Sequence, residues 1–390
     1  MALRVAMVHS FYDSARPSGE NLQVEAEADA LRRAGVEVRV FATRTDDEAR
    51  DPLYPLRCAA RVATGRGASP RRAVDAWRPD VVHVHNLFPN LGRRWVRDLV
   101  TPVVATLHNY RFTCANGVLV RDGRPCTDCP DGHRSSAVRH RCYRGSLAAT
   151  VPVALGQRRG PAADPLLARA DRLLCLSARQ RRMLEEAGLP PHRLVDWSNF
   201  LPRPLAPPAE PAVPAARRGT LYVGRLSPEK GVLELVRAWT GPDLLTVVGD
   251  GPQAAEVRRA AAGRPVAVRG TLPRAEVVAL MGTSTALLVP GTAPELAPLT
   301  FMEAMASGLP VVVRPPSDLA ATVRGQGVGA VATSVGDMGD DAARVSAEPG
   351  IAWRCRALYA ARFTEAAWQR RLTSLYEDLV APSRREEPAR

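Results

Sequence analysis

Two segments of the chain combine charged side chains with turns that open predicted helices. The first reads Gly-Arg-Leu-Ser-Pro-Glu-Lys-Gly over residues 224–231 and directly follows the apolar run 220–223. Its two cations, Arg225 and Lys230, precede a predicted helix, and the N-terminal end of a helix attracts anions. This pattern favours a diphosphate site, although the segment taken alone is equally compatible with a solvated basic loop.

The second segment carries two glutamates, Glu295 in a predicted loop and Glu303 in a predicted helix beside apolar side chains. A carboxylate among apolar residues is costly unless it is hydrogen-bonded, and the hydroxyls of a ribose can supply the donors. Three backbone N–H groups at the helix start would point at a phosphate, those of Ala297, Leu299 and Thr300. The alternative is a pair of ordinary surface glutamates.

Four cysteines follow the spacing C-x(11)-C-x(2)-C-x(12)-C: Cys114, Cys126, Cys129 and Cys142. This spacing suits a tetrahedral structural zinc site in a loop that lacks a core of its own, with His133 or His140 able to replace one ligand. Two disulfides and unligated thiols are the alternatives. Disulfides are disfavoured by the cytoplasmic location that we expect for this chain.

The chemistry-bearing residues must be positioned by the elements around them, and short apolar runs alternate with amphipathic segments along most of the chain. Twelve runs are predicted strands: 4–8, 36–41, 81–85, 102–107, 172–176, 194–197, 220–223, 244–248, 266–268, 286–289, 311–313 and 329–332. Helical patterns lie between many of them: 21–34, 178–187, 232–239, 254–262, 274–281 and 299–307. Continuous apolar strands separated by helices predict an α/β fold with parallel sheets covered on both faces. Ligands bind such sheets at the carboxyl ends of the strands, where the charged segments lie.

The length of 390 residues predicts about two domains. Six prolines among residues 201–218 predict a semi-rigid linker. We therefore expect an N-terminal, acceptor-binding Rossmann-like domain over 1–200, with a Cys-rich loop at 112–145, and a C-terminal Rossmann-like domain over 219–365. The amphipathic pattern near the end predicts a helix within 366–390 that returns to the N-terminal domain, followed by a tail.

Composition and charge narrow the class of protein. With 46% hydrophobic and 24% charged residues the chain is globular, and no apolar run approaches the ~18–20 residues of a membrane span. No signal peptide is evident, so we expect a cytoplasmic protein. The net charge of +13 is concentrated in residues 1–200, which is compatible with peripheral contact with an anionic membrane surface. Nucleic acid is disfavoured as a partner because aromatics make up only 5% of the chain and no arginine cluster is interleaved with them.

Three motifs, in order, resemble the nucleotide-sugar half of the retaining family 4 glycosyltransferases of GT-B fold. The family pattern of G-R-L-x-x-x-K-G, V-V-G-x-G-P and E-x(7)-E-A-M-A-x-G-x-P-V-V is met at residues 224–231, at 247–252 and from Glu295 through Val311. The resemblance covers nearly the whole chain. It implies two Rossmann-like domains that face each other across a cleft, with a nucleotide-sugar donor bound by the second.

The resemblance also implies a role for each matching residue. Arg225 and Lys230, in the turn that begins at Gly224, would hold the donor diphosphate and stabilise the charge that grows on it, beside Gly251 of the middle motif. Glu303 would bind the ribose, with the phosphate near the backbone of Ala297, Leu299 and Thr300, and Glu295 would bind the transferred sugar. In the N-terminal half, His108 would contact the donor sugar; the alternative for a lone histidine is a structural, hydrogen-bonded role. Gly19 keeps one of two small residues in the family's first loop, whereas Ser18 replaces the glycine often found beside it.

The activity implied is transfer of a hexose or amino sugar from a UDP- or GDP-sugar to a hydroxyl acceptor, in polysaccharide or glycolipid assembly or in natural-product (for example aminoglycoside) biosynthesis. The family retains the anomeric configuration, with the leaving diphosphate assisting deprotonation of the acceptor, so no protein nucleophile is required. No Asp-x-Asp triplet occurs, and no catalytic cofactor is expected. The alternative is a non-catalytic nucleotide-sugar or polysaccharide-binding protein of the same fold; both glutamates and both cations favour the enzyme.

Lys230 is the only lysine among 53 basic residues. A lysine ammonium is a compact point charge, which a planar guanidinium does not imitate. Because Lys230 lies in the loop predicted to bind the diphosphate, we expect this site to require an ammonium group.

Overall fold

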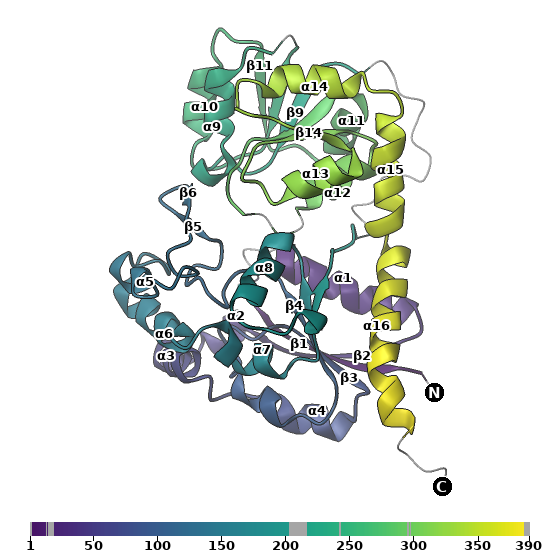
Figure 1. Ribbon diagram of the computed structural model, residues 1–390. Helices are drawn as coiled ribbons and strands as arrows, with labels where there is room; N and C mark the ends of the chain where they lie inside the picture. The colour runs from purple at the N-terminus through teal and green to yellow at the C-terminus, as the bar shows by residue number, and fades with distance from the viewer. Residues whose placement is uncertain are drawn as a thin grey trace. The chain divides into compact units, whose positions relative to one another are not determined.

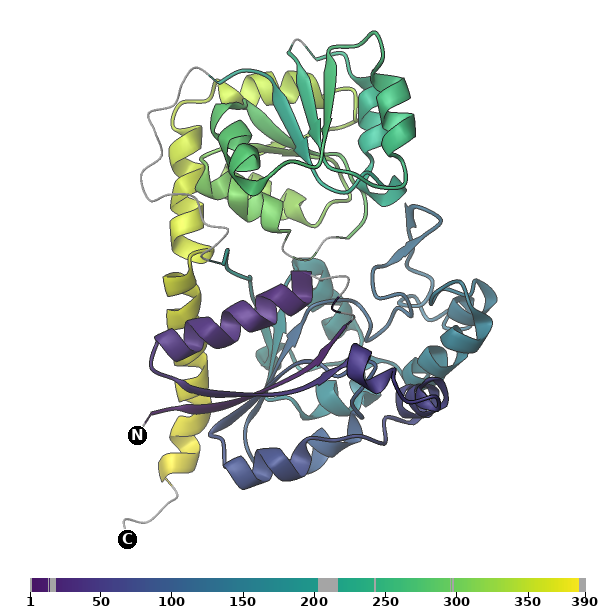
Figure 2. The same cartoon turned by 180° about the vertical axis from the view of Figure 1, so that it is seen from behind.

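The computed structural model describes residues 2–12, 14, 19–202, 217–241, 243–294, 296 and 298–385, with side chains up to residue 381. It divides into two compact units. The first comprises Met1–Val118, Thr127–Asn199 and Trp368–Arg390, and the second comprises Leu119–Cys126 and Phe200–Ala367. Figures 1 and 2 show a sheet with its covering helices in each unit.

The first unit is built on a six-stranded parallel sheet in the order β2-β1-β3-β4-β7-β8. Its strands are β1 (Arg4–Phe11), β2 (Glu37–Arg44), β3 (Val81–Asn86), β4 (Val103–Leu107), β7 (Arg172–Cys175) and β8 (Leu194–Asp196). From β1 the chain goes first to β2 on one side and then to β3 on the other. The carboxyl ends of β1 and β3 therefore flank a topological switch point, where open α/β sheets bind ligands.

Helices connect these strands: α1 (Gly19–Arg33), α2 (Thr45–Glu48), α3 (Tyr54–Thr64), α4 (Arg71–Trp77), α5 (Ser136–Arg139), α6 (Leu147–Gln157), α7 (Pro165–Arg169) and α8 (Ala178–Glu186), with 3-10 turns η1 (Arg94–Asp98), η2 (Pro161–Ala163) and η3 (Pro191–Arg193). Side-chain caps mark several of their starts. The Ser177 hydroxyl accepts a hydrogen bond from the Gln180 N–H at the start of α8, and Ser146 caps α6 in the same way.

The long helix α16 (Glu365–Arg385) belongs largely to the first unit. Trp368, Leu372 and Tyr376 are fully buried and recur every four residues, which places them on one face of the helix. The Gln369 side chain donates a hydrogen bond to the Ala30 carbonyl at 2.6 Å, so α16 packs beside α1.

The second unit is a six-stranded parallel sheet in the order β11-β10-β9-β12-β13-β14. Its strands are β9 (Thr220–Val223), β10 (Leu245–Val248), β11 (Val266–Gly270), β12 (Ala286–Val289), β13 (Val311–Val313) and β14 (Gly329–Val331). Its helices are α9 (Val232–Ala238), α10 (Ala254–Ala261), α11 (Arg274–Thr283), α12 (Leu299–Ala306), α13 (Leu319–Gln326), α14 (Met338–Ser346) and α15 (Ile351–Arg362), with η5 (Pro228–Lys230). The strand order reverses between β9 and β12, which is the switch point of this sheet.

The predicted fold class is confirmed, because both sheets are parallel and each lies in its own α/β unit. No range was predicted for helices α2 to α7 and α13 to α15, or for the antiparallel hairpin of β5 (Val120–Arg121) and β6 (Arg124–Pro125). Most of the predicted linker, residues 203–216, lies outside the described residues, as do Ser18, Glu295 and Ala297. In the described part of the chain, no helix combines the length and the apolar character needed to cross a membrane.

Candidate functional site

The loops that follow β9 and β10 are joined through their backbones at the carboxyl ends of these strands. The Gly224 N–H donates to the Val248 carbonyl at 3.0 Å, and the Leu226 N–H donates to the Asp250 carbonyl at 2.9 Å. These two loops contain the first and middle motifs of the sequence. They lie beside the switch point between β9 and β12.

Two glycines make this close approach of backbones feasible. Gly249 has φ of 137°, and a Cβ there would lie 1.9 Å from the Gly224 carbonyl oxygen. Gly231 has φ of 68°, and a Cβ there would lie 2.8 Å from the Pro290 carbonyl oxygen in the loop after β12. Only a residue without Cβ fits either position. The loops after β9, β10 and β12 are therefore held together at one edge of the sheet.

Arg225 and Lys230 both lie on the loop that follows β9. The Arg225 side chain is exposed, and its carbonyl accepts a hydrogen bond from the Tyr222 hydroxyl at 2.9 Å. Lys230 is half-buried at the end of η5, directly before the Gly231 turn that opens α9. Two cations on one anchored loop can neutralise a diphosphate.

Glu303 lies in α12 and is 5% exposed, and Arg274 at the start of α11 forms an ion pair with it. Arg274 was not predicted as a site residue. In a chain with dozens of arginines a single one carries no sequence signal, and only the packing of α11 beside α12 brings it to Glu303. The pair satisfies a carboxylate whose burial alone would be costly.

Of the other predicted residues of the second unit, two lie in α12 and one lies in the loop after β10. Leu299 and Thr300 form the first turn of α12 and are half-buried. The Gly251 N–H donates to the Asp250 carboxylate at 2.8 Å. Glu295 and Ala297, predicted to bind the sugar and the phosphate, fall outside the residues that the structure describes.

In the first unit, β3 presents histidines on one face. Side chains alternate along a strand, so Val82 and Val84 enter the apolar core while His83 and His85 point to the opposite face. The His83 ring is held at both nitrogens, with Nδ1 2.6 Å from the Tyr376 hydroxyl and Nε2 2.8 Å from the Thr106 hydroxyl. Burial lowers the pKa of His83 to about 3, so the ring is neutral.

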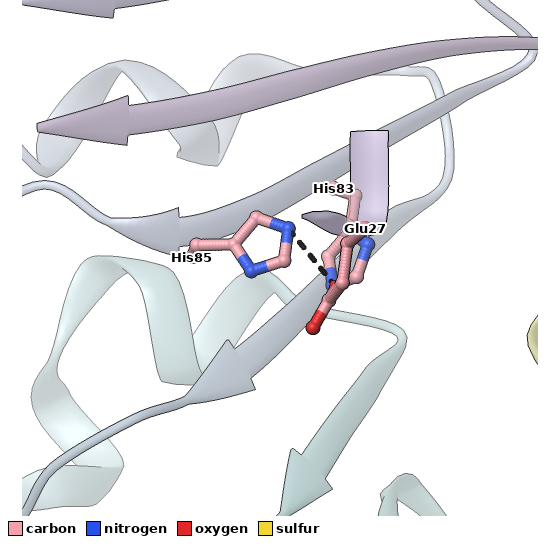
Figure 3. Close-up of side chains that lie close together, drawn as sticks. All are labelled: Glu27, His83 and His85. Carbon is pink, nitrogen blue, oxygen red and sulfur yellow. Dashed lines mark ion pairs between the residues drawn. The ribbon is translucent and has the colours of Figure 1, made fainter. Parts of the chain in front are cut away.

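Opposite this face, α1 brings Glu27 to the histidines (Figure 3). Its Oε2 lies 3.8 Å from His85 Nε2, and the other ring nitrogen, Nδ1, lies 3.0 Å from Nε2 of His108. Burial raises the pKa of Glu27 to about 8, whereas burial and the neighbouring imidazoles hold the pKa of His85 well below its usual range. This arrangement was not predicted.

Glu27, His83 and His85 are, within the described residues, the one group of three or more potential metal ligands close together. They do not fit a metal ion, because both nitrogens of His83 are already bonded to hydroxyl groups. The four cysteines predicted to bind zinc do not form such a group among these residues. The Cys114 thiol donates to the Asn116 side chain at 2.9 Å, and Cys126 lies in the segment that belongs to the second unit.

His108 follows β4, is half-buried, and lines a cavity of about 110 Å³ within the first unit. The polar residues of the cavity nearest to it in sequence are Asn109 and Arg111, and Phe88 contributes to the apolar wall. The Arg111 guanidinium lies 4.2 Å from the centre of the Phe88 ring, an arrangement typical of a cation–π contact.

Glu20, in the first turn of α1 next to Gly19, lies close to this cavity. Asn109 Nδ2 donates to its carboxylate at 3.4 Å, and burial raises the pKa of Glu20 to about 7. A Cβ at Gly19 would meet no atom of the described residues within 4 Å.

Comparison with protein families identifies both halves of the chain. Residues 17–202 match the model described as Glycosyltransferase Family 4, and residues 217–347 match the model described as Glycosyl transferases group 1. No sequence among the curated proteins is significantly similar to the chain.

Solved structures show the same fold over nearly the full length. Sucrose-phosphate synthase from Thermosynechococcus elongatus is 19% identical with a TM-score of 0.62, and the match covers 97% of this chain and 100% of that one. HepE from Anabaena, in complex with UDP and glucose, is 16% identical with a TM-score of 0.59, over 96% and 100% of the two chains. A glycosyltransferase involved in avilamycin A biosynthesis is 19% identical with a TM-score of 0.57, over 97% and 98%. At these identities the likeness establishes the architecture.

Proposed function

Since the chain belongs to the family 4 glycosyltransferases of GT-B fold, we propose that it is a retaining enzyme that transfers a sugar from a nucleoside diphosphate to a hydroxyl acceptor. The single observation that carries the proposal is the junction of the loops after β9, β10 and β12 at the switch point of the second sheet. This junction holds two cations and a buried glutamate on neighbouring loops and helices.

The loop after β9 would bind the donor diphosphate. Arg225 and Lys230 supply two positive charges from a loop that is anchored to its neighbours by backbone contacts. As the bond from the anomeric carbon to the diphosphate breaks, negative charge grows on the leaving oxygen. Cations already in place stabilise that charge without rearrangement, which lowers the barrier.

Glu303 would bind the ribose hydroxyls of the donor, as the family resemblance implies. Its ion pair with Arg274 orients the carboxylate and offsets the cost of burying it. A charged carboxylate accepts hydrogen bonds from two neighbouring hydroxyls. Leu299 and Thr300, at the start of α12, would add backbone N–H donors for the phosphate, with Gly251 on the adjacent loop.

His108 in the first unit, and Glu295 in the loop after β12, would contact the transferred sugar. In a retaining reaction the acceptor oxygen forms its bond to the anomeric carbon on the face that the diphosphate leaves. The departing diphosphate oxygen takes the acceptor proton. The protein therefore supplies orientation and charge rather than a nucleophile.

We further propose a UDP-sugar as the donor, with a hexose or amino sugar as the group transferred. HepE, similar in fold, is described in complexes with UDP and with UDP-glucose. The acceptor would be a hydroxyl of a polysaccharide, a glycolipid or a natural product. Similar structures include a lipopolysaccharide galactosyltransferase and the avilamycin enzyme, which favours a carbohydrate-bearing acceptor.

Calorimetric titration with UDP- and GDP-sugars tests the donor site. We expect saturable binding of one UDP-sugar, weakened about tenfold or more by Glu303→Ala, because the buried carboxylate that binds the ribose is lost. The control is Glu276→Ala, which removes an exposed glutamate from the neighbouring helix α11. Equal binding by wild type and Glu303→Ala would contradict this assignment. Tight binding with no turnover on a broad acceptor panel would favour the alternative, a non-catalytic sugar-nucleotide-binding protein.

A structural zinc at the four cysteines stays a prediction. Cys129 and Cys142 pack in one small cluster with Ala115 and Ala137, so part of the set lies close together. Metal analysis of the purified protein should find one zinc per chain, lost in Cys129→Ser. A wild-type protein without zinc would reject the prediction.

A cytoplasmic location and peripheral contact with an anionic membrane also stay predictions. The membrane contact rests on the positive charge of residues 1–200. Sedimentation with anionic vesicles at low and high salt tests it, and a protein that stays in the supernatant at low salt would reject it.

A further inference from the structure

A layer of polar side chains lies between α1 and β3 in the first unit, where apolar side chains are usual. Helix α1 turns Gln23 and Glu27 toward the sheet, and β3 turns His83 and His85 toward α1. All four are at most 5% exposed. Burying polar groups costs free energy unless each is bonded, so this layer disfavours folding unless its members are paired.

Two members of the layer, Glu27 and His85, form a line with His108 that ends at the cavity. Glu27 Oε2 faces His85 Nε2 at 3.8 Å, and His85 Nδ1 lies 3.0 Å from Nε2 of His108. Glu27 Oε2 and His85 Nε2 are both buried, and within the part of the chain that the structure describes neither has a hydrogen-bond partner. A water molecule does not fit between atoms this close, so a small rotation of either side chain makes them partners of each other.

In this line the direction of each hydrogen bond fixes the direction of the next. Each neutral ring has one nitrogen that donates and one that accepts. If Glu27 is ionised, its Oε2 accepts from His85 Nε2–H. His85 Nδ1 then accepts from His108 Nε2–H, which leaves Nδ1 of His108 without a proton.

If Glu27 is protonated, every direction reverses. Gln23 Nε2 lies 3.4 Å from Glu27 Oε1 and donates to it, so the acid proton belongs on Oε2. That O–H donates to His85 Nε2, and His85 Nδ1–H donates to His108 Nε2. The proton of His108 then lies on Nδ1, so its outer nitrogen becomes a hydrogen-bond donor instead of an acceptor.

We propose that Glu27, acting through His85, is a positioning residue that sets which ring nitrogen of His108 carries the proton. Its own protonation thereby decides whether the outer nitrogen of His108 offers a donor or an acceptor at the cavity. The consequence for sugar transfer rests on the proposed function, in which His108 contacts the donor sugar.

The surroundings leave Glu27 as the member of the line that changes charge near neutral pH. Burial raises the pKa of Glu27 to about 8, and burial lowers that of His108 to about 3. The other titratable groups that face the line are His9 from β1, His83 from β3 and Tyr376 from α16. Burial lowers the pKa of His9 and His83 and raises that of Tyr376, so all three groups are neutral near pH 7.

Nitrogen NMR of the full chain with labelled histidine tests the proposal without any assay of activity. Protonated and unprotonated imidazole nitrogens give well-separated ¹⁵N signals, and a His108→Gln spectrum identifies those of His108. In the wild type we expect the proton of His108 to move from Nδ1 to Nε2 as the pH rises from 6 to 10. In Glu27→Gln, the donor Gln23 Nε2 favours the amide oxygen at the Oε1 position, which aims the amide N–H at His85, so the proton of His108 should stay on Nδ1 at every pH.

The matched control is Glu25→Gln, on the exposed face of the same helix, which should behave as the wild type. A wild-type His108 that keeps one tautomer over this range overturns the proposal, and this result does not depend on any variant folding. The same pH response in Glu27→Gln also overturns it. If the tautomer of His108 follows the protonation of Glu27 but no nucleotide sugar is turned over, the role of Glu27 is supported and the proposed function is rejected.

Discussion

Lys230 is the residue at which we expect the proposed diphosphate site to depend on the type of cation. It ends η5 on the loop after β9, and the backbone of that loop is fixed by the Gly231 turn against the loop after β12. A lysine ammonium can approach one phosphate oxygen as a point charge, whereas a guanidinium is planar and needs a wider approach.

We therefore expect Lys230→Arg to lower kcat/KM for the donor about tenfold or more while the melting temperature is kept. Arg258→Lys is the matched control, because it makes the reverse exchange at an exposed position of α10. Steady-state transfer kinetics and thermal unfolding of both variants provide the measurements. Activity of Lys230→Arg close to that of the wild type would show that the single lysine has no special role.

At the scale of elements, the close approach of the loops after β9 and β10 depends on glycine. Gly249 lies so close to Gly224 that a Cβ would meet its carbonyl oxygen at 1.9 Å. The contact joins the end of β10 to the end of β9, so a change at Gly249 moves the loop that carries Arg225.

Gly249→Ala should lower the free energy of unfolding by about 1–3 kcal/mol and weaken donor binding, because the loops must separate. Gly282→Ala is the matched control. It lies in α11, where an added Cβ would meet no atom of the described residues within 4 Å, so the exchange should be neutral or stabilising by about 0.5–1 kcal/mol. Urea unfolding and calorimetry measure both effects. A Gly249→Ala protein with wild-type stability and binding would mean that the loops are not locked together.

The polar layer between α1 and β3 predicts how stability depends on pH. Because burial raises the pKa of Glu27 from its ordinary value of 4.5 to about 8, the folded state holds this proton more tightly than the unfolded state. The stabilising contribution is therefore complete below about pH 4.5 and is lost as the pH rises through about 8. The buried histidines act in the opposite direction, since the lowered pKa of His83 costs stability as the pH falls below 6.5.

Glu27→Gln should remove much of the loss of stability between pH 5 and pH 9, because a glutamine has no proton to lose. Urea unfolding midpoints at pH 5, 7 and 9 measure this, with Glu25→Gln as the exposed control on the same helix. If the midpoint of Glu27→Gln falls with pH as steeply as that of the wild type, Glu27 does not titrate in the buried layer.

The elements show what the sequence could predict and what it could not. Continuous apolar runs marked inner strands such as β12 and β13, because a strand buried on both faces carries few polar side chains. Helix α6 had no prediction, since it carries Pro152 within its span. Glu27 was inside a predicted helix, but only the packing of α1 on β3 shows that it is buried against His85. Arg274 likewise could not be recognised from the sequence, because only the packing of α11 against α12 brings it to Glu303.

At the scale of the whole molecule, the chain contains two units built in the same way. In each, candidate residues lie at the carboxyl ends of strands. In the first unit, His85 lies near the end of β3 and His108 directly follows β4, the next strand in the sheet. In the second unit, Arg225 and Lys230 follow β9, which flanks the switch point. Helix α16 gives its buried face to the first unit although it follows the second in sequence. The family assignment and the sheet topology were accessible from ordered motifs, because those motifs lie on the strand ends that define the fold.

The central claim is that the chain breaks the sugar–diphosphate bond of a nucleotide sugar with retention. Proton NMR of an incubation with a UDP-sugar measures this directly, since hydrolysis by water needs no knowledge of the natural acceptor. We predict slow release of UDP by the wild type, at least tenfold slower release by Glu303→Ala, and a first-formed sugar with the anomeric configuration of the donor. A first-formed sugar of inverted configuration, or no release from any nucleotide sugar that binds, would contradict it.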